Sequence, residues 1–125
     1  MAKRWVEAGG AFQVPFMAVG SKVLEGKPPD PCPQCAHVPL RYYFHEFNRS
    51  RRQGTLWVWC SNCRTSCHLP RVTPRGTMPK DPFVGLGLED FARLETESGE
   101  PLLGRLDRMW DEGVLCAGGG GKARG

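Results

Sequence analysis

The chain has 125 residues, 40% of them hydrophobic, which is enough to bury the core of one modest domain. Its formal net charge of +4 is unevenly placed, because residues 32–72 hold six Lys/Arg and one acidic residue and so carry +5. No apolar run reaches the roughly 20 residues that a membrane-spanning helix needs, and Glu7 and two glycines interrupt the start of the chain before a signal-like apolar core forms. We therefore expect a soluble, cytoplasmic protein with no membrane partner.

The first 31 residues form an N-terminal segment whose type the sequence leaves open. Its apolar residues fit both the alternation typical of a strand and the three- or four-residue spacing of a helix face. They include Phe12, Val14, Phe16, Val19 and Val23. The stretch KPPDP at residues 27–31 then favours an extended linker, since each proline fixes its own φ and biases the residue before it away from helix.

Two strands are predicted at residues 40–47 and 55–60, which are rich in aromatic and β-branched residues. The polar stretch NRSRRQG between them is typical of a hairpin turn. Successive side chains of a strand point to opposite faces, and both faces of this hairpin are apolar. The side chains concerned are Tyr42, Tyr43, Phe44, Phe47, Leu56, Trp57, Val58 and Trp59. We expect the N-terminal segment or the C-terminal helices to cover these faces.

A third strand is expected at about residues 65–72. Pro70 cannot donate a backbone hydrogen bond, so this strand should lie at an edge of the sheet. After a loop at residues 73–87, the apolar residues recur at helical spacing in LEDFARLE and in EPLLGRLDRMWDEG. Residues 88–117 should therefore form a helical segment.

The predicted fold class is α+β, with a small three-stranded sheet packed against the N-terminal segment and the C-terminal helices. We expect one domain over residues 1–117. The glycine-rich residues 118–125 should be disordered.

Five of the six cysteines and all three histidines lie between residues 32 and 68. Cys32 and Cys35 form one Cys-x-x-Cys pair, Cys60 and Cys63 form a second, and a hairpin can bring the pairs face to face. Six cysteines in a secreted chain would suggest disulfides, but two such pairs without an export signal favour metal binding. Zinc takes four ligands tetrahedrally, so we predict one Zn²⁺ bound by these four cysteines.

The two pairs and the hairpin between them resemble the zinc-ribbon superfamily, over residues 32–72 or about a third of the chain. CPQC is similar to the first knuckle of such proteins and CSNC to the second. The resemblance implies two knuckles joined by a β-hairpin around one zinc ion. Ala36 and Arg64 stand where these knuckles often have glycine, so a left-handed backbone there would be costly.

Other side chains could replace one cysteine. His37, Cys67 or His68 could supply a ligand in a Cys₃His site. We favour Cys67 as a small buried hydrophobic residue or a free thiol. His45 lies in the middle of a strand and is expected to be a packed or surface histidine, and Cys116 to be structural or adventitious.

An enzymatic site is not expected. The sequence PCPQC contains the Pro-Cys-x-x-Cys element of zinc deaminases, but those enzymes also need a His-x-Glu, which does not occur here. His45 and Glu46 point to opposite faces of a strand and cannot act together. A metal closed by four cysteines has no open position for water.

The remaining hypotheses describe a binding module. In the first, the basic hairpin contacts nucleic acid, with arginines on phosphates and exposed aromatic rings on bases. The candidate residues are Arg41, Arg49, Arg51, Arg52, Tyr43 and Trp57. In the alternative, the metal site is a scaffold and the protein is a protein-binding adaptor or an immunity-type protein, because the same residue types also make protein interfaces. Neither hypothesis involves a small-molecule substrate.

Overall fold

The computed structural model describes residues 4–38, 40–76, 78 and 81–115. In chain order, its helices and strands are β1 Val6–Glu7, α1 Gln13–Leu24, β2 Arg41–Asn48, β3 Gln53–Trp59, β4 Thr65–Val72, α2 Leu88–Ser98 and α3 Leu102–Asp111. Short 3₁₀ helices precede α1 and follow β2. No helix in this part of the chain is both long and apolar enough to cross a membrane. Cys116 and the predicted tail at residues 118–125 lie outside the described residues.

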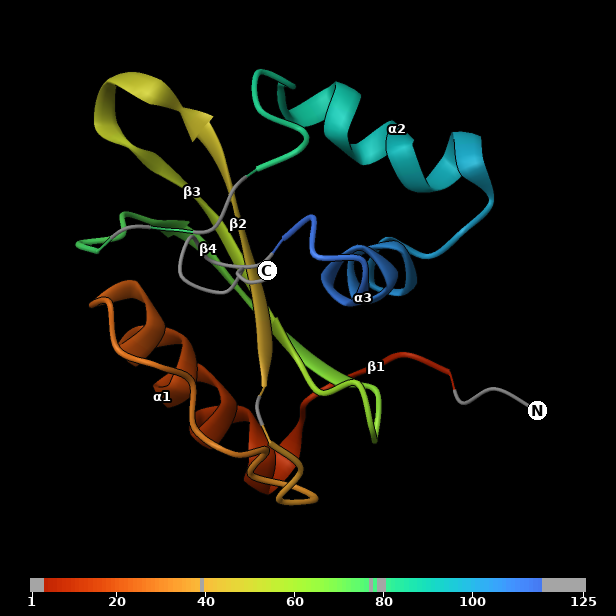
Figure 1. The fold of residues 1–125 in the computed structure, drawn as a ribbon. Helices are drawn as coiled ribbons and strands as arrows, with labels where there is room; N and C mark the ends of the chain where they lie inside the picture. The colour runs from red at the N-terminus through yellow and green to blue at the C-terminus, as the bar shows by residue number, and fades with distance from the viewer. Residues whose placement is uncertain (1–3, 39, 77, 79–80, 116–125) are drawn as a thin grey trace.

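A four-stranded mixed sheet is the centre of the fold, in the order β1-β4-β3-β2 (Figure 1). β2, β3 and β4 pair antiparallel, and Tyr43 lies opposite Trp57. The predicted hairpin and third strand are therefore present, and the predicted α+β class is confirmed. β1 is an addition that the sequence patterns did not indicate. It pairs parallel to β4 at Thr65 and Ser66, so the prediction that β4 lies at an edge of the sheet is wrong for this part of the strand. Pro70 lies beyond the pairing with β1, where its missing N–H breaks no hydrogen bond to that strand.

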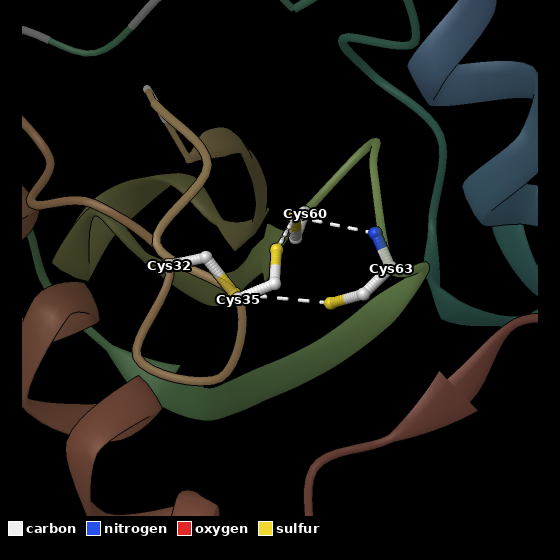
Figure 2. Close-up of side chains that lie close together, drawn as sticks. All are labelled: Cys32, Cys35, Cys60 and Cys63. Atoms are coloured by element: carbon white, nitrogen blue, oxygen red, sulfur yellow. Dashed lines mark hydrogen bonds between the residues drawn. The ribbon is translucent and has the colours of Figure 1, made fainter.

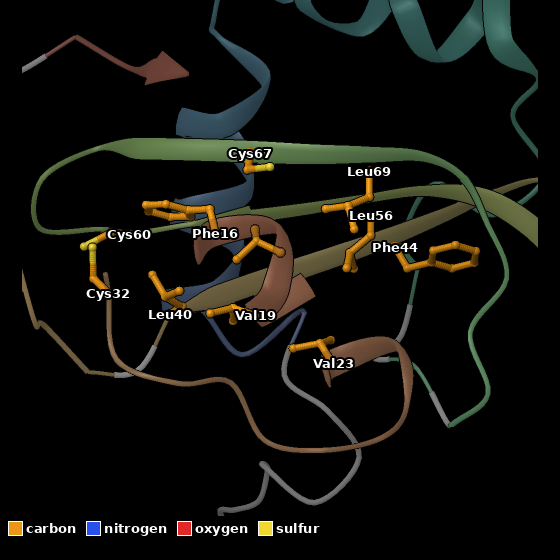
Figure 3. Packing of buried hydrophobic residues seen from close by; sticks show 11 residues of the cluster. Phe16, Val19, Val23, Cys32, Leu40, Phe44, Leu56, Cys60, Cys67 and Leu69 are labelled. Atoms are coloured by element: carbon orange, nitrogen blue, oxygen red, sulfur yellow. The ribbon is translucent and has the colours of Figure 1, made fainter. Parts of the chain in front are cut away.

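Helix α1 covers one face of the sheet, which settles the type of the N-terminal segment (Figures 1 and 3). Phe16, Val19 and Val23 are buried on one side of the helix, at the spacing that predicts such a face. They pack against Leu40, which directly precedes β2, and against apolar side chains of the strands, namely Phe44, Leu56, Val58, Cys67 and Leu69. Complete burial of each large side chain stabilises the fold by about 1.5–3 kcal/mol.

Helices α2 and α3 lie on the opposite face of the sheet (Figure 1). Phe91 of α2 and Leu106 of α3 are buried there with Tyr43 and Trp59 of the sheet. The prediction that the flanking segments pack on the apolar faces of the hairpin is confirmed, because α1 packs on one face and α2 and α3 cover part of the other.

A polar contact fixes α3 to the sheet. The Arg41 guanidinium donates from Nη1 to Oδ1 of Asp107 at 2.9 Å, and its Nη2 lies 2.8 Å from Oδ1 of Asp111. Nε1 of the fully buried Trp59 donates to the same Asp107 oxygen at 2.9 Å. Asp107 therefore satisfies two donors that the sheet presents to the helix.

Candidate metal centre

The four cysteines of the two Cys-x-x-Cys pairs come together at one end of the hairpin (Figure 2). Their sulfur atoms all lie within 4.8 Å of one another, with 3.8 Å between Cys32 and Cys63 and 3.5 Å between Cys35 and Cys60. Four sulfurs bound tetrahedrally at about 2.3 Å from one ion would lie about 3.8 Å apart. The four cysteines form no disulfide, because their sulfur atoms are much farther apart than the S–S bond length of about 2.05 Å. The group could hold one metal ion.

The two knuckles have the same backbone structure. The N–H of Ala36 donates to the carbonyl of Cys32 at 2.8 Å, and the N–H of Arg64 donates to the carbonyl of Cys60 at 3.0 Å. The N–H of the first cysteine of each knuckle also donates to the carbonyl five residues later. The distance is 2.9 Å from Cys32 to His37 and 3.0 Å from Cys60 to Thr65. Two equivalent turns thus present two cysteines each to a common centre.

Ala36 and Arg64 adopt the left-handed backbone that glycine normally occupies in such turns. Their φ angles are 67° and 59°. This conformation costs a non-glycine residue about 1–2 kcal/mol. The Arg64 guanidinium lies 5.2 Å from the centre of the Trp5 ring, a cation–π contact that stabilises its position. The knuckles therefore form without glycine, and the free energy of binding a metal would offset the strain.

Hydrogen-bond donors face the sulfurs, as expected for thiolate ligands. The backbone N–H of Gln34 donates to Sγ of Cys32 at 3.4 Å, and that of Cys63 donates to Sγ of Cys60 at 3.5 Å. The Asn62 side-chain amide donates to Sγ of Cys35 at 3.4 Å and lowers the pKa of Cys35 to about 6. These hydrogen bonds favour the thiolate form of the cysteines, which is the form that binds a metal cation.

The first cysteine of each pair belongs to the hydrophobic core. Cys32 is 3% exposed and Cys60 is 0% exposed, and both lie at one end of the cluster under α1 (Figure 3). Burial raises the pKa of Cys32 and raises that of Cys60 to about 12. A buried thiolate needs a compensating positive charge, which a bound cation supplies. The four-cysteine group is thus continuous with the core under α1.

The other candidate ligands lie outside this group. Among the His, Cys, Asp and Glu side chains of the described residues, the four cysteines lie close enough together to hold a metal. His37 is exposed, and His68 pairs through Nδ1 with Glu7 at 3.1 Å. Cys67 is buried in the core under α1, so its prediction as a small buried hydrophobic residue is confirmed.

The candidate binding residues are divided between the surface and the interior. Arg49, Arg51 and Arg52 are exposed at the hairpin turn. Arg41 is engaged by Asp107 and Asp111, and Tyr43 is 1% exposed against Phe91. Trp57 is half-buried on the face that α2 and α3 partly cover. Of the six candidate residues, the three turn arginines and the exposed part of Trp57 are therefore accessible to a ligand.

The turn holds these arginines in a defined structure. Oδ1 of Asn48 accepts hydrogen bonds from Ser50 Oγ at 2.9 Å and from the Arg51 N–H at 3.3 Å. Thr73 Oγ1 donates to the Arg51 carbonyl at 3.4 Å, which joins the end of β4 to the turn. Arg71, also exposed, lies on that end of β4. We call Arg49, Arg51, Arg52 and Arg71 the basic tip; none of the four has an ion pair within the described chain.

A buried polar cluster, which the sequence patterns did not reveal, lies under α2. Nδ1 of His45 is 2.8 Å from Oδ2 of Asp81, and Nε2 is 3.0 Å from the Leu86 carbonyl. Tyr43 donates its hydroxyl to Asp81, and Phe91 stacks on the His45 ring at 4.3 Å. Both ring nitrogens face acceptors, and the imidazolium form of His45, which has an N–H on each nitrogen, satisfies both of them. The prediction that His45 is a packed or surface histidine is confirmed in its packed form.

This cluster predicts a pH-dependent stability. Burial by itself would lower the pKa of His45, but the hydrogen bonds to Asp81 and Leu86 and the negative charge of Asp81 hold it above its ordinary 6.5. A raised folded pKa contributes stability that is fully present below the unfolded pKa and is lost as the pH rises through the folded value. The free energy of unfolding should therefore fall above about pH 6.5, by at most about 1.4 kcal/mol per pH unit from this group.

Urea unfolding at several pH values would measure this effect. Asp81→Asn should remove the fall that His45 causes, because the imidazolium loses its carboxylate partner. Asp30→Asn is the matched control, since Asp30 pairs with Lys22 at the surface and the change should leave the pH dependence intact. Equal pH dependence in the two variants would show that His45 is not held as the imidazolium.

Comparisons of the chain with protein-family models, with curated proteins and with solved structures found no match. The similarity to zinc ribbons therefore stands on the two cysteine pairs and the geometry of their knuckles. What the structure establishes is a four-cysteine group that could hold a metal in an α+β fold.

Proposed function

We propose that the protein is a non-enzymatic zinc-ribbon module that binds one Zn²⁺ through Cys32, Cys35, Cys60 and Cys63 and contacts nucleic acid through the basic tip. The observation that carries the proposal is the placement of the two features at opposite ends of the β2–β3 hairpin. The metal would fasten the strand ends next to the knuckles. The tip would then project as a rigid, positively charged contact.

The chemistry of the four ligands supports zinc. Soft thiolate ligands in a tetrahedral arrangement select zinc or iron–sulfur centres over hard cations such as magnesium and calcium. The 3.5 and 3.8 Å sulfur separations suit one ion. A site closed by four sulfurs leaves no position for water or substrate, so the metal would be structural.

The charge distribution supports a polyanionic partner. The four guanidiniums of the basic tip are exposed and have no ion pair within the described chain. Arginines placed together in this way can bind successive phosphates and release counterions, which makes nucleic-acid affinity strongly dependent on salt. A cytoplasmic location would suit this function and would keep the cysteines reduced.

Replacing Arg49, Arg51 and Arg52 together with alanine tests the contact. Metal content and melting temperature should stay nearly unchanged, because exposed turn charges contribute little to stability. Affinity for nucleic acid should fall, and the slope of log affinity against log salt should flatten by up to about 0.9 per lost contact on duplex DNA or about 0.7 on single strands.

Arg93→Ala is the control, because Arg93 is an exposed arginine of α2 that pairs with Asp90 and Glu97. It should leave the salt slope unchanged. If the triple variant binds with unchanged affinity and slope, the basic tip is a solvated turn and the protein-binding alternative replaces this proposal.

A further inference from the structure

A groove runs along the face of the sheet that α2 and α3 only partly cover. It consists of three adjoining hollows of about 320, 370 and 270 Å³. The first two share Phe47, Thr55 and Leu88, and the second and third share Trp57 and His68. The groove therefore continues from Arg71 in the basic tip to Trp5 beside β1.

Half-buried aromatic side chains occur along the whole length of the groove. Phe47 lines the hollows near the basic tip, Trp57 the middle, and Trp5 the far end. Trp57 packs against Phe91 at 5.3 Å and still lines two of the hollows. An aromatic ring that is held in place in this way can stack on a planar ligand without first losing side-chain freedom.

The charge at the tip end of the groove favours an anionic ligand, and the aromatic rings beyond it favour apolar, planar parts of that ligand. Arg71 of the basic tip lies at this end, whereas the hollow beyond Trp5 at the other end has side chains of both charges. They are Arg4, Arg64 and Arg108 with Glu95, Glu100, Asp107 and Asp111. Glu7 in the groove is paired with His68. Glu95, the second acidic residue, accepts a hydrogen bond from the Leu102 N–H at 2.6 Å. Both carboxylates therefore already have partners.

We propose that this groove binds a segment of single-stranded nucleic acid, with phosphates at the basic tip and unstacked bases on Phe47, Trp57 and Trp5. The inference rests on the proposed function and specifies its ligand. A duplex keeps its base faces stacked inside and can reach the arginines only through phosphates, whereas a single strand can also place bases on aromatic rings. A polypeptide without acidic residues could use the apolar surface but would leave the four arginines of the basic tip without anions.

The test compares a 12-nucleotide oligothymidylate with a 12-base-pair duplex, both fluorescein-labelled, by fluorescence anisotropy. Leu88→Glu places a carboxylate in the groove. Leu88 is 69% exposed and is the first residue of α2, where a negative charge is compatible with folding. Val14→Glu adds the same charge on α1, on the opposite face of the sheet, at a side chain 71% exposed.

We expect the wild type to bind the single strand at least about tenfold more tightly than the duplex. Leu88→Glu should weaken oligothymidylate binding by about tenfold or more relative to Val14→Glu, while the two variants bind the duplex equally. Trp57→Leu offers a second readout, because oligothymidylate should quench tryptophan fluorescence in the wild type and less in this variant.

Three outcomes would overturn the inference. If Leu88→Glu and Val14→Glu bind oligothymidylate equally while the triple arginine variant binds it weakly, the tip binds nucleic acid without the groove, and only the groove assignment fails. If the wild type prefers the duplex, the single-strand assignment fails. If the wild type binds neither probe, the proposed function fails as well and the groove is left to a polypeptide partner.

Discussion

Cys60→Ser should abolish metal binding and lower the free energy of unfolding by about 3 kcal/mol or more. Cys60 is fully buried, so its loss removes a ligand and breaks the core at the same point. The remaining three thiols would no longer enclose the ion, and the buried Cys32 sulfur would lose the cation that compensates its negative charge. Urea unfolding, together with metal content measured on the same sample, would give both quantities.

Cys67→Ser is the matched control for this change. Cys67 is also buried in the core under α1, but it lies outside the four-cysteine group. Its replacement should keep the metal and cost about 1–3 kcal/mol for the buried hydroxyl. A Cys60→Ser protein that retains its metal, or that is no less stable than Cys67→Ser, would contradict the role assigned to Cys60.

Gly54→Ala should destabilise the fold by about 3 kcal/mol or more, because the hairpin has no room for a Cβ at this position. Gly54 lies opposite Glu46 beside the irregularity in the β2–β3 pairing. A Cβ here would lie 1.9 Å from the His45 carbonyl oxygen and 2.8 Å from Cα of Glu46. Both atoms belong to the backbone, so the strands themselves would have to separate.

Gly104→Ala makes the same chemical change where a methyl group fits. Gly104 is inside α3, and the nearest atom to an added Cβ is Nε1 of Trp5 at 3.5 Å. Alanine should stabilise this helix by about 0.5–1 kcal/mol. Thermal and urea unfolding of the two variants would compare them directly, and a Gly54→Ala protein within about 1 kcal/mol of the wild type would contradict the packing described for this hairpin.

The hairpin and the cysteine group could be predicted because their signals are local. Successive side chains of a strand point to opposite faces, so the position of each residue in β2 and β3 predicts its face. Phe44 and Tyr43 are indeed buried on opposite faces. The spacing of each Cys-x-x-Cys pair brings two sulfurs to one centre whatever follows in the chain. The sequence did not decide between strand and helix for α1, because its apolar residues fit both spacings. The sheet that Phe16 and Val19 pack against favours the helix.

The parts that could not be predicted depend on contacts between distant residues. His45 and Asp81 are 36 positions apart, and Arg41 and Asp107 are 66 apart. Nothing near Arg41 in the sequence distinguishes an arginine that fixes α3 from one that contacts a ligand. β1 likewise forms because the Arg64 and Ser66 carbonyls accept hydrogen bonds from the N–H groups of Val6 and Ala8, not because residues 6 and 7 have a strand pattern.

Metal analysis of the purified, folded protein tests the central claim most directly. Elemental analysis combined with native mass spectrometry should find one zinc ion per chain. Cobalt substitution should give the absorption of a tetrahedral four-thiolate site, and this absorption should be lost in Cys60→Ser and kept in Cys67→Ser. A folded protein without near-stoichiometric metal, or one in which Cys32, Cys35, Cys60 and Cys63 form disulfides, would contradict the account.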